Sequence, residues 1–125
     1  MRVARLFDGK DAAGQWAFAP DRPRLADAGE RARIARFLSG GKVIRRVVTT
    51  DVDRVEPANG RVVPVLTHTD GTWIWSAAVR YYVETHGIAP EPDFLAHIVA
   101  HEYVAPEPDE AAWRAALDQL RQQGP

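Results

Sequence analysis

The sequence predicts one α+β domain over residues 1–125, with a small antiparallel β-sheet, one helix in the N-terminal half and about three C-terminal helices packed on one face of the sheet. Three observations predict this class. Short strand-like segments recur through the first 75 residues around one helical stretch, helical patterns follow from residue 76, and an Asp-Gly pair between two apolar runs marks a central hairpin. A chain of 125 residues is long enough to bury a core of its own.

The central hairpin is predicted within residues 62–76 and runs directly into a helix. Asp70 and Gly71 suit the central positions of a type I′ turn, because both positions require positive φ. With that turn, His68 lies opposite Trp73. Strand side chains alternate between faces, so one face carries Leu66, His68, Trp73 and Trp75, and the other carries Val63, Val65, Thr67 and Ile74.

The two tryptophans of the hairpin have two interpretations. Aromatic side chains dominate core energetics, so they fit the core; they are also enriched at binding hot spots, so they fit an aromatic recognition surface with His68 beside Trp73. The second interpretation makes the hairpin a binding site. Its candidate binding residues are Trp73, Trp75, His68 and Asp70, together with Arg45 from a neighbouring basic cluster.

The chain begins with two predicted strands. Residues 2–7 alternate between apolar and polar positions, which favours a strand, and residues 15–19 form a second short strand pattern. Residues 8–11 have the composition of a loop between them. An N-terminal hairpin is therefore expected, ended by Pro20 and Pro23.

The first helix is expected over residues 24–39, where apolar residues form a stripe at helical spacing. Its N-terminus is alternatively at Asp27, because an acid there and Glu30 three residues later resemble a capping box. Gly40 and Gly41 provide a helix stop.

Residues 42–50 are rich in β-branched side chains and predict another strand. Pro57, Asn59 and Gly60 then mark a turn before the central hairpin. Pro64 lies inside the first strand of that hairpin. Because proline cannot donate a hydrogen bond to a β-ladder, it favours an edge strand or a strand that begins after it.

Three helices are expected in the C-terminal half. Ser76 suits the N-cap of a helix over residues 77–86, and Gly87 suits the position after its end. The pentapeptide APEPD occurs twice, and each copy precedes a helical pattern, first over residues 94–103 and then over residues 110–123. Proline and acidic residues at these positions are typical of helix N-termini.

Composition excludes several classes of protein. The chain has no cysteine, which excludes disulfides, thiolate metal sites and a cysteine nucleophile. It has no apolar run long enough for a membrane span, and its first residues lack the apolar core of a signal peptide. We therefore expect a cytoplasmic protein that has no contact with a membrane.

Charge is unevenly distributed along the chain. Residues 1–61 hold 13 basic and 8 acidic side chains, whereas residues 62–125 hold 3 basic and 9 acidic ones. Six of the basic residues cluster between Arg31 and Arg46. Arginine forks bind phosphate well, but Arg45 and Arg46 point to opposite faces of a strand. A solvated face or a patch for an acidic protein partner is therefore expected, with a nucleic-acid surface as an alternative.

The histidine pattern offers a metal site as an alternative. His97 and His101 are four residues apart, so they share a helix face and can chelate one metal ion. A zincin pattern requires Glu directly after the first histidine, where this chain has Ile98. His68, His86 and Glu102 are candidates for a third ligand, but none is identifiable as one, so no metal and no cofactor is expected.

Other catalytic signals are weak. Asp51 and Asp53 share a strand face if that segment is extended, and paired carboxylates can act as acid and base. No third group organises them, however, and the chain contains neither a phosphate-binding glycine loop nor a nucleophile elbow. The sequence therefore favours a protein that is not an enzyme.

The TDGTWIW hairpin, the YY-containing helix and the pattern HG-x-x-P-x-P-x-x-x-x-H-I occur together within residues 60–98. In these features the segment resembles a small actinobacterial protein family of uncharacterised activity. The resemblance brings no catalytic residues. Small cysteine-free α+β proteins of this kind are often partners in toxin–immunity or secretion-linked gene clusters, so the resemblance implies an immunity- or antitoxin-like role.

These observations together predict a non-enzymatic protein-binding module, an immunity- or antitoxin-like partner that covers a site on another protein. A small metal-dependent enzyme that uses His97 and His101 is the first alternative. A nucleic-acid binder that uses the basic cluster from Arg31 to Arg46 is the second. Self-association into a homo-oligomer also remains open.

Overall fold

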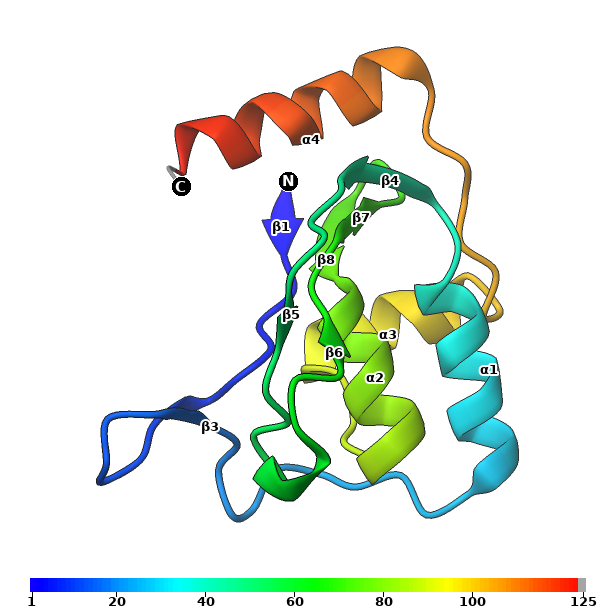
Figure 1. Ribbon diagram of the computed structural model, residues 1–125. Coiled ribbons are helices and arrows are strands. Elements are labelled where there is room, and N and C mark those ends of the chain that lie inside the picture. Colours follow the sequence, from blue (N-terminus) through cyan, green and yellow to red (C-terminus); the bar gives the residue numbers. More distant parts are fainter. Residues whose placement is uncertain (124–125) are drawn as a thin grey trace.

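A four-stranded mixed sheet lies between two layers of helices in the computed structural model, which describes residues 1–123 (Figure 1). The strand order is β1-β8-β7-β4. The strands are β1 (Arg2–Val3), β8 (Trp73–Ser76), β7 (Thr67–Thr69) and β4 (Lys42–Arg45). The helices are α1 (Ala28–Leu38), α2 (Ala77–His86), α3 (Pro92–Ala100) and α4 (Glu110–Gln122). The predicted α+β class, with one N-terminal and three C-terminal helices, is confirmed.

The sheet is mixed rather than purely antiparallel. β7 is antiparallel to both β4 and β8, but β1 runs parallel to β8. Parallel strands need a long connection between them, and here residues 4–72 supply it. The N-terminal strand is therefore at one edge of the sheet and β4 is at the other.

The register of the β7–β8 hairpin differs by two residues from the predicted one. His68 lies opposite Trp75 instead of Trp73. The cause is the Asp70 side chain, which accepts hydrogen bonds from the backbone N–H groups of Thr72 (2.9 Å) and Trp73 (2.8 Å) and so widens the turn. A one-residue slip would turn every side chain over, but a two-residue slip leaves each one on its predicted face.

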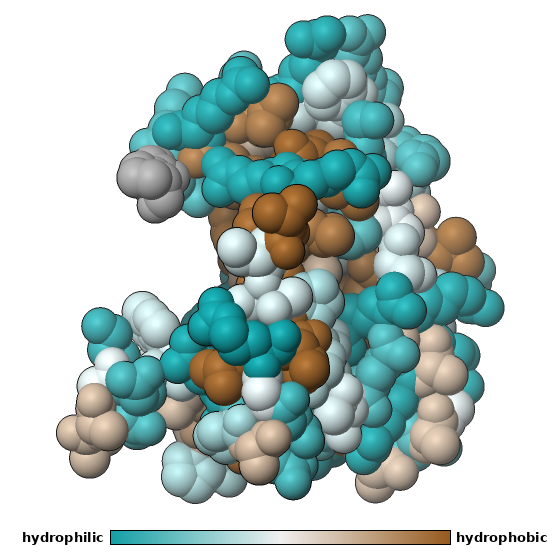
Figure 2. Space-filling model, in the orientation of Figure 1, coloured by the Kyte–Doolittle hydropathy of each residue, from teal (hydrophilic) through white to brown (hydrophobic). Residues whose placement is uncertain are grey.

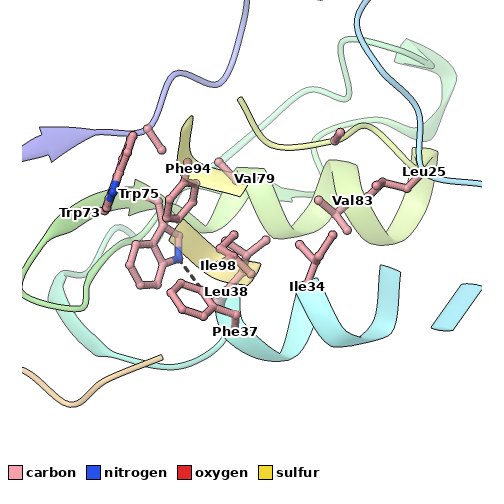
Figure 3. Packing of buried hydrophobic residues seen from close by; sticks show 12 residues of the cluster. Leu25, Ile34, Phe37, Leu38, Trp73, Trp75, Val79, Val83, Phe94 and Ile98 are labelled. Carbon is pink, nitrogen blue, oxygen red and sulfur yellow. Dashed lines mark hydrogen bonds between the residues drawn. The ribbon is translucent and has the colours of Figure 1, made fainter. Parts of the chain in front are cut away.

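The core lies between one face of the sheet and helices α1, α2 and α3 (Figure 3). The Trp75 side chain is completely buried and donates a hydrogen bond from Nε1 to the carbonyl oxygen of Leu38 (3.0 Å), shown as the dashed line. Trp73 is 4% exposed, and the ring of Phe94 packs against both indoles. The interpretation of Trp73 and Trp75 as an exposed recognition surface is therefore wrong, and the core interpretation is confirmed.

Helix α4 covers the opposite face of the sheet, so the expectation that all C-terminal helices share one face is wrong (Figure 1). The reason is the alternation along β8. Ile74 points away from its two tryptophan neighbours and needs apolar cover of its own. Ala116 and Leu120 of α4 provide it, with Ile44 beside them.

Two short two-stranded ribbons extend from the sheet. The first pairs β2 (Gly9–Lys10) with β3 (Trp16–Ala17), so residues expected to form a loop are a strand instead. The turn moves because the Asp11 carboxylate accepts hydrogen bonds from the N–H groups of Ala13 and Gln15. Residues 2–7 do not form the predicted hairpin, since their first residues pair with β8.

The second ribbon pairs β5 (Thr50–Asp51) with β6 (Val63–Pro64). The strand predicted over residues 42–50 is therefore split into β4 and β5 by four residues with no strand pairing. A short 3₁₀ turn, η1 (Pro57–Asn59), lies at the far end of the ribbon. Pro64 is in an edge strand, as its missing N–H requires. Val63 anchors the ribbon in a second apolar cluster with Ala78, Tyr82 and Ile88.

The predicted N-cap of α1 and both predicted ends of α2 agree with local capping, whereas the helix predicted over residues 94–103 is α3, which ends at Ala100 because Glu102 and Tyr103 have positive φ. Asp27 accepts a hydrogen bond from the N–H of Glu30, which confirms the later of the two predicted starts for α1. Ser76 caps α2, and Gly87 ends it with a positive φ of 66°. Within residues 1–123, no helix has the length and apolar character needed to cross a membrane.

Candidate functional site

The structure does not gather the five predicted binding residues into one surface. Trp73 and Trp75 are core residues, and the His68 ring stacks on Trp75 with 5.6 Å between centroids and 2° between planes. Asp70 is 4% exposed and is used within the fold. Arg45 is on the edge strand β4, where its side chain is half-buried. The candidate site is therefore built from other neighbours of these residues.

Asp70 forms a buried pair with His97, which α3 presents to the hairpin turn. Nε2 of His97 donates to Oδ2 of Asp70 at 2.6 Å. The imidazole lies among the rings of Phe37, Trp73 and Phe94. The pair therefore joins the hairpin turn to a helix that follows it in the chain.

His101, the predicted second metal ligand beside His97, also makes a hydrogen bond within the fold. The His101 ring lies 4.3 Å from the His97 ring, and its Nδ1 donates to the carbonyl oxygen of His97 at 2.9 Å. The described residues contain no group of three or more histidine, cysteine or acidic side chains placed to hold a metal ion. The two rings do lie side by side, as their spacing predicts, but His101 is the C-cap residue of α3 and not part of the helix.

Asp53 forms a second buried pair, with His86 at the end of α2. Nε2 of His86 donates to Oδ2 of Asp53 at 2.7 Å, and the hydroxyl of Tyr81 donates to the same oxygen at 2.7 Å. Burial alone raises the pKa of the Asp53 carboxyl, but the hydrogen bonds from His86, the Glu56 N–H, Tyr81 and Asn59 outweigh it. The carboxyl pKa is therefore held well below its ordinary value.

Asp51 and Asp53 do not form the carboxylate pair that the sequence allowed. Asp51 makes an ion pair with Arg54 at 2.8 Å, whereas Asp53 is completely buried and bound to His86. Sequence reasoning missed this cluster because 33 residues separate Asp53 from His86. The only local signal was the turn composition around Asn59, which predicts a loop and not its partner.

A cavity of about 360 Å³ opens between α2 and strands β4, β6 and β7. Its apolar lining is Val43, Pro64, Leu66 and Ala77. Its polar lining is His68, Arg80, Tyr81 and Glu84. A more open groove between α1 and α2 shares Arg80 and Glu84 with it. The described chain therefore has a concave region along one side of α2, where polar and apolar side chains meet.

An apolar and basic surface lies next to this cavity, on the connection between β4 and β5. Val48 is fully exposed there and Val47 is 37% exposed. Arg45 and Arg46 precede them, and no hydrogen bond or ion pair within residues 1–123 involves either guanidinium group. Figure 2 shows hydrophobic side chains in brown among hydrophilic ones in teal over this part of the face. We call residues 45–48 the Arg-Val segment.

The other basic residues of the cluster contact their own fold. Arg31 donates to the carbonyl oxygen of Leu25 at 2.7 Å, and Arg36 donates to that of Tyr103 at 3.4 Å. The guanidinium of Arg33 lies over the Tyr103 ring. The six basic side chains of the cluster therefore do not form one continuous free surface.

Comparisons with known proteins return no relative. The resemblance to a small actinobacterial family, carried by residues 60–98, therefore stays a prediction, and the function has to be argued from the residues described above. No protein-family model, no curated protein and no solved structure matches the chain.

Proposed function

We propose that this protein is a cytoplasmic, non-enzymatic binding module that covers a site on another protein, as immunity and antitoxin proteins do. The observation that carries the proposal is the Arg-Val segment, residues 45–48. A fully exposed valine beside a second exposed valine is apolar surface without cover. The module would place this surface on its partner.

The backbone of the segment supports the same role. Residues 46–49 lie outside the strand pairings of both β4 and β5. β4 is an edge strand, so its outer N–H and C=O groups face away from the sheet. Exposed strand edges bind extended segments of partner proteins by adding a strand. The segment therefore offers both backbone and side-chain contacts.

Charge indicates the kind of partner. Arg45 and Arg46 are adjacent cations, and the nearest acid on the ribbon, Asp51, is neutralised by Arg54. Opposite charge across an interface accelerates association and excludes wrong partners. The partner surface is expected to be acidic around an apolar centre.

The test is site-specific photo-crosslinking in cells of the native host. A photo-reactive phenylalanine analogue replaces Val48, and a matched control replaces Val104, which is also exposed at 61% but lies between α3 and α4. The proposal expects one crosslinked protein of fixed stoichiometry from position 48 and none from position 104. Reversing charge with Arg45→Glu and Arg46→Glu should abolish that crosslink without changing the circular dichroism spectrum.

Three outcomes contradict the proposal. These are no crosslinked protein at position 48, equal labelling from both positions, and a crosslink that survives the charge reversal. A crosslink only to a second copy of the chain would replace the proposed partner with a homo-oligomer.

A further inference from the structure

The cavity beside α2 has the dimensions and composition of a small-molecule site. Its volume of about 360 Å³ is within the range of ligand pockets. Apolar side chains from β4, β6, the link between β6 and β7, and α2 form half of its lining, and a few polar side chains converge on it. This combination of an apolar wall and few polar groups gives a ligand both affinity and a fixed orientation.

His68 is the buried polar group of this cavity. The residue is only 8% exposed, and its ring is held flat against Trp75. Nδ1 lies 3.0 Å from the carbonyl oxygen of Gly40. Because a carbonyl oxygen only accepts hydrogen bonds, Nδ1 carries the proton in this contact. In the neutral ring, Nε2 is therefore left with an unshared electron pair.

Nε2 of His68 has no hydrogen-bond partner within residues 1–123, although Nδ1 has one. Within residues 1–123, every side-chain nitrogen or oxygen that is fully shielded from solvent has a hydrogen-bond partner. Because Nε2 has none, it must be accessible to solvent. The side chain is in the lining of the cavity, which gives Nε2 its opening. The site thus presents one unpaired nitrogen on a side chain that is more than nine-tenths buried.

The electrostatic field around His68 is positive. Burial lowers the pKa of His68, and the charges of Arg80 and Arg46 lower it further against the opposing hydrogen bond with Gly40. Glu84 is the only acid in the lining, and it pairs with Nε of Arg80. The groove beyond Arg80 adds Arg31 and Arg36 from α1.

The cation at the cavity is free to bind an anion. Glu84 occupies only Nε of Arg80 among the contacts within residues 1–123, which leaves both Nη groups as donors. A guanidinium with two free Nη groups binds a carboxylate well. An ammonium group would meet Arg80 and Arg46 with one acid to offset them, so the field favours an anion.

We propose that this cavity binds a small carboxylic acid with an apolar group, whose carboxylate lies between Nε2 of His68 and the guanidinium of Arg80. The apolar group contacts Val43, Pro64, Leu66 and Ala77. Binding takes one proton from solvent onto Nε2, which then donates to a carboxylate oxygen. The affinity therefore falls as pH rises, by up to about tenfold per pH unit between the pKa of His68 in the free protein and its higher pKa in the complex. The cavity lining shares no residue with the Arg-Val segment, although the charge of Arg46 acts on His68.

Three probes of one carbon skeleton test the proposal: 4-phenylbutyrate, 4-phenylbutanamide and 4-phenylbutylamine. Their binding to the full chain is followed by NMR between pH 6 and pH 8, with the His68 Cε1 resonance as the reporter of protonation. The acid is expected to bind at least about tenfold more tightly than the amine at pH 6, an energy difference of about 1.4 kcal/mol. The His68 titration midpoint is expected to rise in the complex.

Two variants separate the roles of the polar groups. Arg80→Gln changes an exposed side chain and is expected to weaken acid binding about tenfold while the pH dependence remains. His68→Gln is expected to remove the pH dependence. His101→Gln is the control, since His101 is exposed and lies outside the lining, and it should bind the acid as the wild type does.

The proposal is overturned if the amine binds as tightly as the acid. It is also overturned if none of the three probes shifts resonances of the lining residues at millimolar concentration, or if affinity for the acid is the same at pH 6 and pH 8. If His101→Gln lowers the affinity for the acid as much as Arg80→Gln does, the acid binds outside this cavity and the proposal fails.

Discussion

The molecule contains two buried Asp–His pairs with nearly the same geometry and different surroundings. In the first pair, Nε2 of His97 lies 2.6 Å from Oδ2 of Asp70, and in the second, Nε2 of His86 lies 2.7 Å from Oδ2 of Asp53. In both pairs the carboxylate is almost completely buried and the histidine belongs to a helix. The difference lies in the other donors to each carboxylate.

Asp53 accepts five hydrogen bonds and Asp70 accepts three. Oδ2 of Asp53 has three donors, namely Asn59, Tyr81 and His86. Oδ2 of Asp70 has only His97 within the described chain. A buried charge is costly when it has no partner. The comparison therefore indicates that the hydrogen bond from His86 is dispensable, because Oδ2 of Asp53 has two other donors. The hydrogen bond from His97 is necessary, because Oδ2 of Asp70 has no other donor within the described chain.

The largest expected effect is the loss of the His97 side chain. His97→Ala leaves Oδ2 of Asp70 buried without a donor and removes a ring that packs against Trp73 and Phe94. The free energy of unfolding is expected to fall by roughly 3 to 4 kcal/mol. Urea denaturation followed by tryptophan fluorescence measures this change.

A second substitution tests whether the unpaired carboxylate is the cause. Asn at position 70 keeps an oxygen for the N–H groups of Thr72 and Trp73 but carries no charge. The double variant Asp70→Asn/His97→Ala is therefore expected to be more stable than His97→Ala alone. If it is less stable, the cost of His97→Ala is lost packing, and the comparison between the two pairs fails.

The next effect is a pH dependence confined to the Asp53 region. Burial raises the pKa of Tyr82 from 10.0 to about 12, with smaller contributions from the charges of Asp53 and Asp51, against the hydrogen bond from the Arg54 N–H. A raised pKa stabilises the fold below pH 10, and this stabilisation is lost between pH 10 and about pH 12.

The free energy of unfolding should fall by about 2 to 3 kcal/mol by about pH 12, since one pKa unit corresponds to about 1.4 kcal/mol. Denaturation curves of the wild type and Tyr82→Phe across this range measure it, because the variant lacks the titrating hydroxyl. Parallel curves for the two proteins would show that the hydroxyl contributes no alkaline sensitivity.

The sequence predicts the local features of the fold better than the contacts of the site. Caps at Asp27 and Ser76, and the faces of the central hairpin, follow from neighbouring residues and are confirmed. The hairpin register was wrong because the Asp70 side chain, and not Gly71 alone, shapes the turn. Side-chain hydrogen bonds of this kind compete with the standard turn and are not visible in a turn pattern.

Contacts across long separations explain most of what the sequence did not predict. Asp70 and His97 are 27 residues apart, and β1 pairs with β8 across 71 residues. Hydrophobic alternation identified both faces of β8, but it could not show that α4 covers Ile74 while α1 and α3 cover Trp75. The sequence did not predict the exposure of the Arg-Val segment for the same reason. β-branched residues indicate a strand, but whether a partner strand covers it depends on residues far away in the sequence.

The smallest expected effect is the loss of the His86 side chain, and it sharpens the comparison most. After His86→Ala, Asp53 keeps four donors, which are the N–H groups of Val55 and Glu56, the Asn59 amide and the Tyr81 hydroxyl. The change should therefore cost only about 1 kcal/mol, as for one hydrogen bond among several. Hydrogen exchange should show any lost protection within residues 50–64 and not in α1 or α3, because the Asp53 cluster joins the β5–β6 ribbon to α2. A loss as large as that of His97→Ala would mean that the shared donors do not compensate for one another, and the number of donors would then not explain the difference between the two pairs.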